Sequence, residues 1–228
     1  MTTTRSLLCI ASAAFALVLP LLVVAPGFSQ DKEKVSRRYP PASLDSSDLR
    51  EFADQPEEVQ RLIEQALALT RRDLSYQYGS ADPEKGGMDC SGTVHYVLKS
   101  VGYRKVPRQA NQIYEWVWKN SRFHAVVSEV SGGFEMARLK PGDLLFWRGT
   151  SDATRAPPVT HVMVYLGTIK EGKPVMFGAS NGRSYAGKAR NGVSVFDFGF
   201  PTPRKSASGS QARFIGYGSI PAKEKPKG

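Results

Sequence analysis

The stretch Met88-Asp89-Cys90-Ser91-Gly92-Thr93-Val94-His95-Tyr96-Val97 decides the fold, because it places a cysteine where a loop becomes a helix. Gly86 and Gly87 mark the loop before it, and the apolar residues after it recur at helical spacing, at Val94, Val97, Leu98 and Val101. The unpaired amides and the dipole at a helix start stabilise a thiolate, so the position predicts a lowered cysteine pKa and a nucleophile. The alternative is a small, buried apolar cysteine.

Residues 1–29 are typical of a secretory signal, with Arg5 ahead of an uncharged apolar run and small residues at Gly27 and Ser29. We therefore expect export to the periplasm, the cell wall or the extracellular space. An uncleaved N-terminal anchor is the alternative, and it would be the sole contact with a membrane. Cys9 lies in this segment, so the mature chain keeps Cys90 alone. An unpaired exported cysteine points to intermolecular pairing or to a reactive thiol.

The formal net charge of +10 indicates either simple solubility or attraction to a polyanion such as the cell wall or anionic lipid. The chain has no aromatic–basic repeat and no zinc-finger spacing, so no nucleic-acid partner is expected. No metal or organic cofactor is implied, and we expect a monomer.

The order of predicted elements indicates an α+β fold, with N-terminal helices packed on a mainly antiparallel sheet of five to six strands. A linker or loosely docked arm at 30–54 precedes one domain at 55–220, and a basic tail follows at 221–228. Asp54 is the expected cap of the first helix. Helices are expected at 56–72, 90–102 and 107–120, and strands at 143–147, 161–166, 175–179, 193–198 and 214–217.

A cysteine nucleophile needs a base, and the chain has three histidines. His95 lies five residues after Cys90 on the same helix, about 140° round its axis, and so faces elsewhere. His124 lies in a stretch without a clear pattern. His161 begins a strand directly after a loop, where a sheet can present a side chain to a helix end, so it is the preferred base; a surface histidine is the alternative.

Four motifs in order resemble the NlpC-type cell-wall cysteine endopeptidases. They are Tyr76-Gln77-Tyr78-Gly79 ahead of Asp89-Cys90-Ser91-Gly92, then Val106-Pro107-Arg108, then Leu139-Lys140-Pro141-Gly142-Asp143-Leu144, and Thr160-His161-Val162. The resemblance implies a circularly permuted papain-like fold and cleavage of peptidoglycan stem peptides, typically between D-glutamate and diaminopimelate. It implies Cys90 as nucleophile, His161 as base and Tyr76 as a group that assists at the oxyanion. It places Asp89, Ser91 and Arg108 along the substrate groove.

The chain departs from that family where a third polar residue is expected on the strand after the base. The matching position is Gly178, which has no side chain. Ser180 shares its strand face, and Asn181 follows with a carbonyl that can accept from an imidazole. Asn181 is the preferred orienting residue and Ser180 a substrate-groove residue. A backbone carbonyl could serve instead, or residues 180–182 could simply form a turn.

The sequence therefore predicts an exported cysteine peptidase that hydrolyses peptidoglycan peptides through a thioester. Two alternatives stay open. The chain could be a catalytically weak relative that binds wall peptides, a possibility raised by Gly178, or a thiol-dependent amidase or acyltransferase with another substrate.

Overall fold

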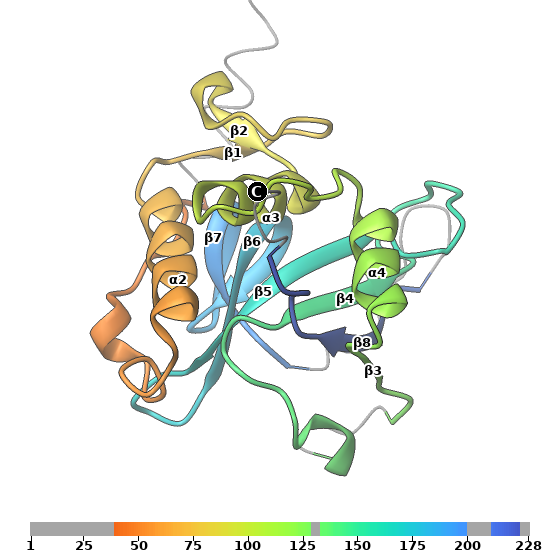
Figure 1. The fold of residues 1–228 in the computed structure, drawn as a ribbon. Helices are drawn as coiled ribbons and strands as arrows, with labels where there is room; N and C mark the ends of the chain where they lie inside the picture. Colours follow the sequence, from red (N-terminus) through yellow and green to blue (C-terminus); the bar gives the residue numbers. More distant parts are fainter. Residues whose placement is uncertain (1–38, 129–132, 200–210, 224–228) are drawn as a thin grey trace, which may run out of the picture.

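The computed structural model describes residues 39–128, 133–199 and 211–223, and in these it places helices on one face of a six-stranded antiparallel sheet (Figure 1). The helices are α2 (Glu57–Thr70), α3 (Cys90–Ser100) and α4 (Ala110–Lys119). The sheet order is β3-β8-β4-β5-β6-β7. Its strands are β3 (Phe123–Ala125), β4 (Leu144–Arg148), β5 (His161–Thr168), β6 (Pro174–Tyr185), β7 (Lys188–Asp197) and β8 (Arg213–Gly218). The predicted α+β class, with helices on a mainly antiparallel sheet, is confirmed.

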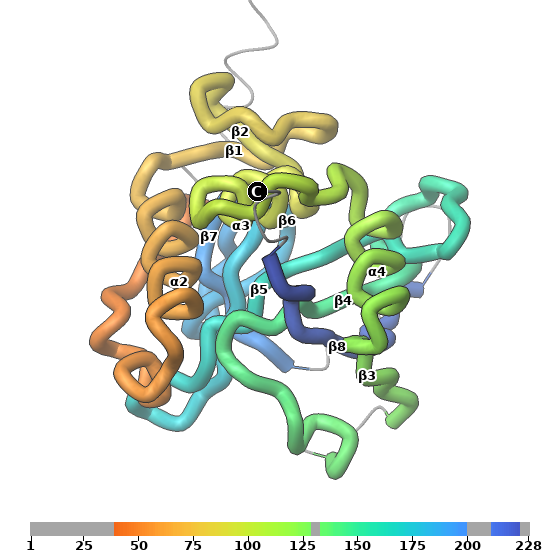
Figure 2. The backbone as a smooth tube through the Cα atoms, in the orientation of Figure 1, coloured from red at the N-terminus to blue at the C-terminus, as the bar shows by residue number. Residues whose placement is uncertain are grey.

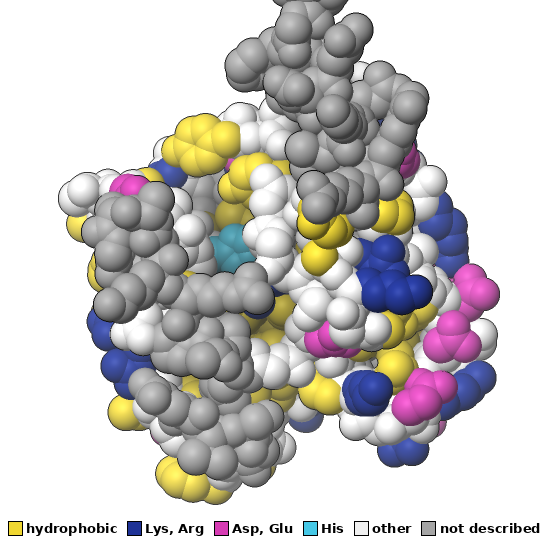
Figure 3. Space-filling model, turned by 180° about the vertical axis from the view of Figure 1, so that it is seen from behind, with side chains coloured by type: hydrophobic (Ala, Val, Ile, Leu, Met, Phe, Trp, Pro, Cys, Tyr) yellow, Lys and Arg dark blue, Asp and Glu magenta, His cyan; other side chains and the backbone are white. Residues whose placement is uncertain are grey.

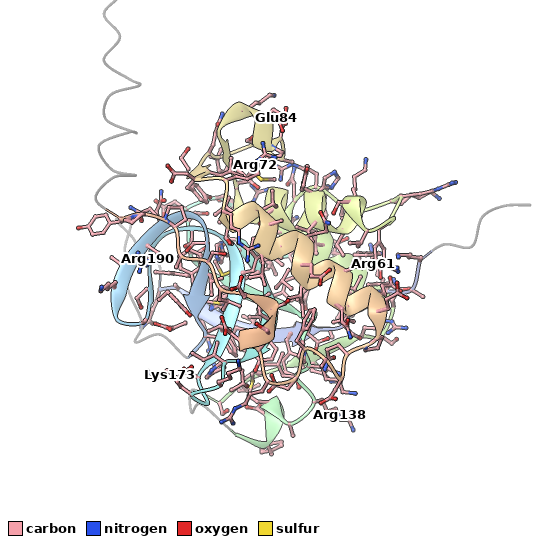
Figure 4. All side chains as sticks on the ribbon, turned by 90° about the vertical axis from the view of Figure 1, so that its left-hand side faces the viewer. Arg61, Arg72, Glu84, Arg138, Lys173 and Arg190 are labelled. Carbon is pink, nitrogen blue, oxygen red and sulfur yellow. The ribbon has the colours of Figure 1, made fainter. Side chains whose placement is uncertain are left out.

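Short segments between α2 and α3 form a separate layer above α3 (Figure 2). Strands β1 (Ser75–Tyr76) and β2 (Gly87–Met88) pair in parallel, and the 3-10 turn η2 (Pro83–Lys85) lies between them. An ion pair of 2.8 Å between Arg72 and Glu84 ties this layer to the end of α2, and both side chains are labelled in Figure 4. This layer delivers Tyr76 to the start of α3.

The sheet buries apolar side chains on both faces because its central strands read as nearly continuous apolar runs. The face under the helices packs Val162, Val164 and Phe177 against α2 and α3. The opposite face buries a second, aromatic-rich cluster. Its members are Val126, Leu145, Trp147, Met163, Tyr165, Met176, Phe196, Phe198, Phe214 and Tyr217. The sequence predicted five of the six strands of this sheet but not the two clusters.

The described part of the predicted arm packs against the domain and is not a linker. Leu44 and Leu49 are buried in the core, and residues 46–48 form the 3-10 turn η1 (Ser46–Asp48). Ala42 exchanges hydrogen bonds with β7, from its N–H to Ser194 Oγ (2.8 Å) and from Val195 N–H to its carbonyl (2.9 Å). The predicted signal at 1–29 lies outside the described residues, as does the end of the predicted basic tail. Lys223 is part of the fold, paired with Glu58 at 3.0 Å.

Several expected boundaries differ from the structure. Pro56, not Asp54, is the N-cap of α2, without a side-chain hydrogen bond. Strands β6 and β7 continue well beyond the expected 175–179 and 193–198, because they form one long hairpin. Strand β3 was not predicted; it pairs with β8, far along the chain, and has no pattern of its own. Within the described ranges, no helix has the length and apolar character needed to cross a membrane.

Candidate active site

Helix α3 begins at Cys90, as predicted, because Asp89 caps it. The Asp89 carboxylate accepts a hydrogen bond from Gly92 N–H at 2.6 Å, and its carbonyl accepts from Thr93 N–H at 3.0 Å. Gly92 is required by packing: a Cβ there would lie 2.1 Å from the carbonyl oxygen of Ser80. These contacts hold the cysteine at the first helical position, against the sheet.

The side chain of Cys90 faces the backbone at the beginning of β5. Its Sγ lies 4.0 Å from the carbonyl oxygen of Thr160, and Val162 N–H donates toward the sulfur. The two residues that contact the sulfur flank His161, so the structure brings the predicted nucleophile and the predicted base into one cleft. Cys90 and His161 are both almost fully buried, at 5% and 6% exposure.

The predicted thiolate is not favoured in this environment. Burial, and to a lesser extent the Asp89 carboxylate, raise the pKa of the Cys90 thiol to about 11, although the amides of Val162 and Ser91 and the charge of Arg108 act to lower it. The expectation of a lowered cysteine pKa was therefore wrong. At this buried helix start, the thiolate loses more stabilisation by water than the backbone amides supply. Burial, with the positive charge of Arg183, lowers the pKa of His161 well below its usual value. The resting pair is thus a neutral thiol and a neutral imidazole.

The His161 ring is held by packing and not by an orienting side chain. It lies edge-on to Trp147, with ring centroids 5.6 Å apart, and its buried Nε2 makes no hydrogen bond with any described residue. At Gly178, the expected site of a third residue, a Cβ would lie only 2.9 Å from Met163 Cγ. Met163 fills the space that a larger residue would need.

Neither Asn181 nor Ser180 donates to or accepts from the imidazole in the structure. Ser180 is buried, lines the cleft and shares the sheet face of Gly178 and His161. Asn181 is exposed, and strand alternation turns it to the other face. It lines the cleft without contacting His161, so its expected orienting role has no structural basis.

Tyr76 ends β1 at the edge of the cleft, half-buried. Burial, and the nearby Cys90 and Asp89, raise the pKa of its phenol. The hydroxyl therefore stays protonated and can donate a hydrogen bond. This is the property needed by the oxyanion-assisting role that the resemblance implied.

Three of the four predicted groove residues, Asp89, Ser91 and Arg108, form one network beside Cys90. Arg108 donates to both carboxylate oxygens of Asp89, at 3.0 and 2.9 Å, and to Ser91 Oγ at 3.0 Å. The Asp89 side chain is 8% exposed and that of Arg108 is 32% exposed. The network fixes the start of α3 and leaves one side of the arginine facing the cleft.

All eight predicted site residues line one cleft of about 1040 Å³. They are Tyr76, Asp89, Cys90, Ser91, Arg108, His161, Ser180 and Asn181. Seen from the face away from the helices, a histidine side chain lies at the bottom of a hollow (Figure 3). The other histidines have structural contacts: His95 Nδ1 lies 3.2 Å from the Pro107 carbonyl, and His124 packs on Tyr217.

Two arginines, Arg155 and Arg183, are among the cleft residues that the sequence did not predict. Arg155 comes from the polar loop before β5 and donates to Tyr78 Oη (3.1 Å) and to the Gln109 side chain, bridging two cleft walls. Arg183 comes from the extension of β6 that the sequence pattern did not predict. An arginine in a polar segment carries no signal of this placement. No cluster of potential metal ligands occurs among the described residues.

Comparison with known proteins finds similar chains. The murein DD-endopeptidase MepH of Escherichia coli (strain K12) is 33% identical over 99 residues, which is 42% of this chain and 29% of MepH. The chain thus spans less than a third of that relative. A crystal structure of a lipoprotein-like NLP/P60 protein from Staphylococcus aureus aligns over 79% of this chain and 44% of its own, at 23% identity and a TM-score of 0.46.

The profile of the NlpC/P60 family matches residues 73–192, the segment that runs from just before β1 through Cys90 and His161 into β7. It covers more than half of the chain and every predicted site residue. The chain therefore belongs to the NlpC/P60 family.

Proposed function

We propose that this protein is an exported cysteine endopeptidase that hydrolyses amide bonds in peptidoglycan stem peptides. The observation that supports it is the placement of Cys90 Sγ against the two residues that flank His161, at the bottom of a cleft. Family membership and the murein-directed activity in the name of the relative agree with a wall substrate. A hydrolase needs no further group here, because a thiol, a base and oxyanion donors suffice for acyl transfer.

The neutral resting pair gives the order of proton transfers. His161 takes the Cys90 proton as the sulfur attacks the amide carbon, which avoids a standing ion pair that the buried site disfavours. The Tyr76 hydroxyl and the Cys90 N–H are the candidate donors to the oxyanion that forms. His161 then returns the proton to the leaving amine. A water molecule, activated by the same imidazole, hydrolyses the thioester.

The cleft suits an extended peptide with acidic groups. Its lining includes three arginines and two carboxylates, so positive side chains outnumber negative ones. They are Arg108, Arg155, Arg183, Asp89 and Asp197. The bond between D-glutamate and diaminopimelate is the proposed target. Cleavage of a D,D cross-link, the activity named for the relative, is the competing outcome.

Digestion of defined muropeptides by purified protein tests the proposal. We expect mass spectrometry to find a new amine and a new carboxyl at the D-glutamyl bond. Cys90→Ala and His161→Ala should abolish cleavage, while His95→Ala, whose histidine contacts Pro107 outside the cleft, should keep it. Failure to cleave any muropeptide, with folding verified, would reject the proposal.

The unpartnered Nε2 of His161 and the absent side chain at Gly178 favour one other function, that of a wall-peptide binder with little turnover. Binding of the same muropeptides by isothermal titration calorimetry, without cleavage over long incubation, would support that alternative. Cleavage of other acyl substrates in place of muropeptides would instead support an amidase or acyltransferase.

A further inference from the structure

A bulge in β6 brings an arginine into the cleft on the side of His161. The register between β6 and β7 shifts between Asn181 and Arg183, and Gly182 takes a φ of +82° there. Side chains alternate along a strand, so without the extra residue Arg183 would share the face of Asn181. The bulge returns it to the face that carries Ser180 and His161. The glycine supplies the backbone conformation that the bulge needs.

The arginine is held by an aromatic ring next to the base. Its Cζ lies 4.6 Å from the centroid of a Trp147 ring, and the same indole packs edge-on to His161. Stacking uses the flat face of a guanidinium, while its N–H groups point outward in the plane of the group. The indole therefore holds the guanidinium beside His161. Arg183 lines the cleft and is close enough to His161 for its charge to act on the imidazole.

The two walls of the cleft face different parts of the substrate during the reaction. After attack, the acyl part stays on Cys90, beside the network of Asp89, Ser91 and Arg108. The amine part must leave past His161, because the imidazole returns the proton to it. Arg183 therefore lies near the residue that supplies the amine.

We propose that Arg183 is a specificity-determining residue that binds a carboxylate carried by the amine-side residue of the substrate. A guanidinium matches a carboxylate with two parallel hydrogen bonds, a geometry that a carboxamide cannot reproduce. The bound carboxylate also offsets the positive charge beside His161, so the imidazole accepts the Cys90 proton more readily once substrate is in place. This inference rests on the proposed endopeptidase function.

The test uses two synthetic stem peptides that differ in one group, a free carboxylate or a carboxamide on the residue that supplies the amine. For the unaltered protein we expect kcat/KM to favour the carboxylate by on the order of 10- to 100-fold. Arg183→Met should reduce that ratio to about one, with the loss falling on the carboxylate peptide. Arg183→Lys, which keeps the charge without the planar fork, should give an intermediate ratio.

Arg190→Met is the matched control. Arg190 pairs with Arg183 across the hairpin, but it contacts the Pro40 carbonyl and is not part of the cleft lining; Figure 4 labels it on β7. It should keep the wild-type ratio. If Arg183 has a purely structural role, Arg183→Met should lower kcat/KM equally for both peptides and leave their ratio unchanged. That result would overturn the inference.

Other outcomes are distinguishable. Equal cleavage of both peptides by the unaltered protein would overturn the inference while leaving the endopeptidase function intact. If Arg155→Met and not Arg183→Met removes the preference for the carboxylate peptide, the carboxylate site lies on the opposite wall. That result would also overturn the inference. Cleavage of neither peptide would reject the proposed function itself, and this inference with it.

Discussion

The protonation state of Cys90 offers the sharpest measurement, because the structure reverses what the sequence predicts. The perturbation is pH, applied to the Cys9→Ser protein so that Cys90 is the only thiol. With a pKa of about 11, the thiolate fraction at pH 7.5 is about 300-fold lower than for an ordinary thiol of pKa about 8.5. The higher basicity makes each thiolate about 10- to 18-fold more nucleophilic. Alkylation should therefore be about 17- to 30-fold slower.

The assay is the rate of iodoacetamide labelling followed by mass spectrometry from pH 6 to 11. Burial slows the reagent at every pH, so the shape of the profile is decisive and the absolute rate is not. We expect the rate to rise through pH 10 without a plateau. In concentrated urea, the labelling rate of the same protein should have the midpoint of an ordinary thiol, at about pH 8.5.

A plateau below pH 8.5 in the folded protein would refute the reasoning. It would mean that the helix start and the neighbouring amides outweigh desolvation, as the sequence alone suggested, and that a thiolate–imidazolium pair exists at rest.

Three further predictions concern stability and the missing orienting residue. Burial raises the pKa of Asp143 to about 6, so between pH 4 and 6 the folded state binds more protons than the unfolded state. The free energy of unfolding therefore falls by up to about 3 kcal/mol as pH rises through that window. Asp143→Asn, which keeps an acceptor for Lys140 N–H, should flatten that slope in urea titrations and be more stable than wild type at pH 7; an unchanged slope would contradict this. Gly178→His should lower the denaturant midpoint, at a cost of about 1–3 kcal/mol, because the new side chain would collide with Met163. Adding Met163→Ala should restore the midpoint and raise turnover. A Gly178→His protein as stable as wild type would disprove the packing argument. Asn181→Ala should change turnover less than about twofold, because the side chain is exposed on the face away from His161; a tenfold loss would restore the orienting role expected from the sequence.

The central part of the site could be predicted because local patterns determine it. The glycine loop and the helical spacing place Cys90 at the start of a helix, and a strand that begins after a loop places His161. These signals lie within a few residues of the groups they place. The same holds for the α+β order of elements, which follows from the change of apolar period along the chain.

The rest depends on contacts between distant segments. Arg183 reaches the cleft through the bulge at Gly182, which no local sequence pattern predicts. The pKa of Cys90 depends on how completely the sheet covers it, which the sequence does not state. Arg183 stacks on Trp147, 36 positions earlier in the chain; no spacing rule connects the two.

The docked arm covers part of the outer edge of β7. Strand β7 is the last strand of the sheet, and a bare outer strand offers unpaired amides and carbonyls to a second molecule. Here Asn191 and Val195 donate to the carbonyls of Tyr39 and Ala42, and Val193 donates to Leu74. Trimming the chain back to α2 would uncover the N–H groups of Asn191 and Val195 together with the apolar sites that Leu44 and Leu49 fill. We expect the shortened protein to pair strand to strand and aggregate, even though Cys90 and His161 would both be present.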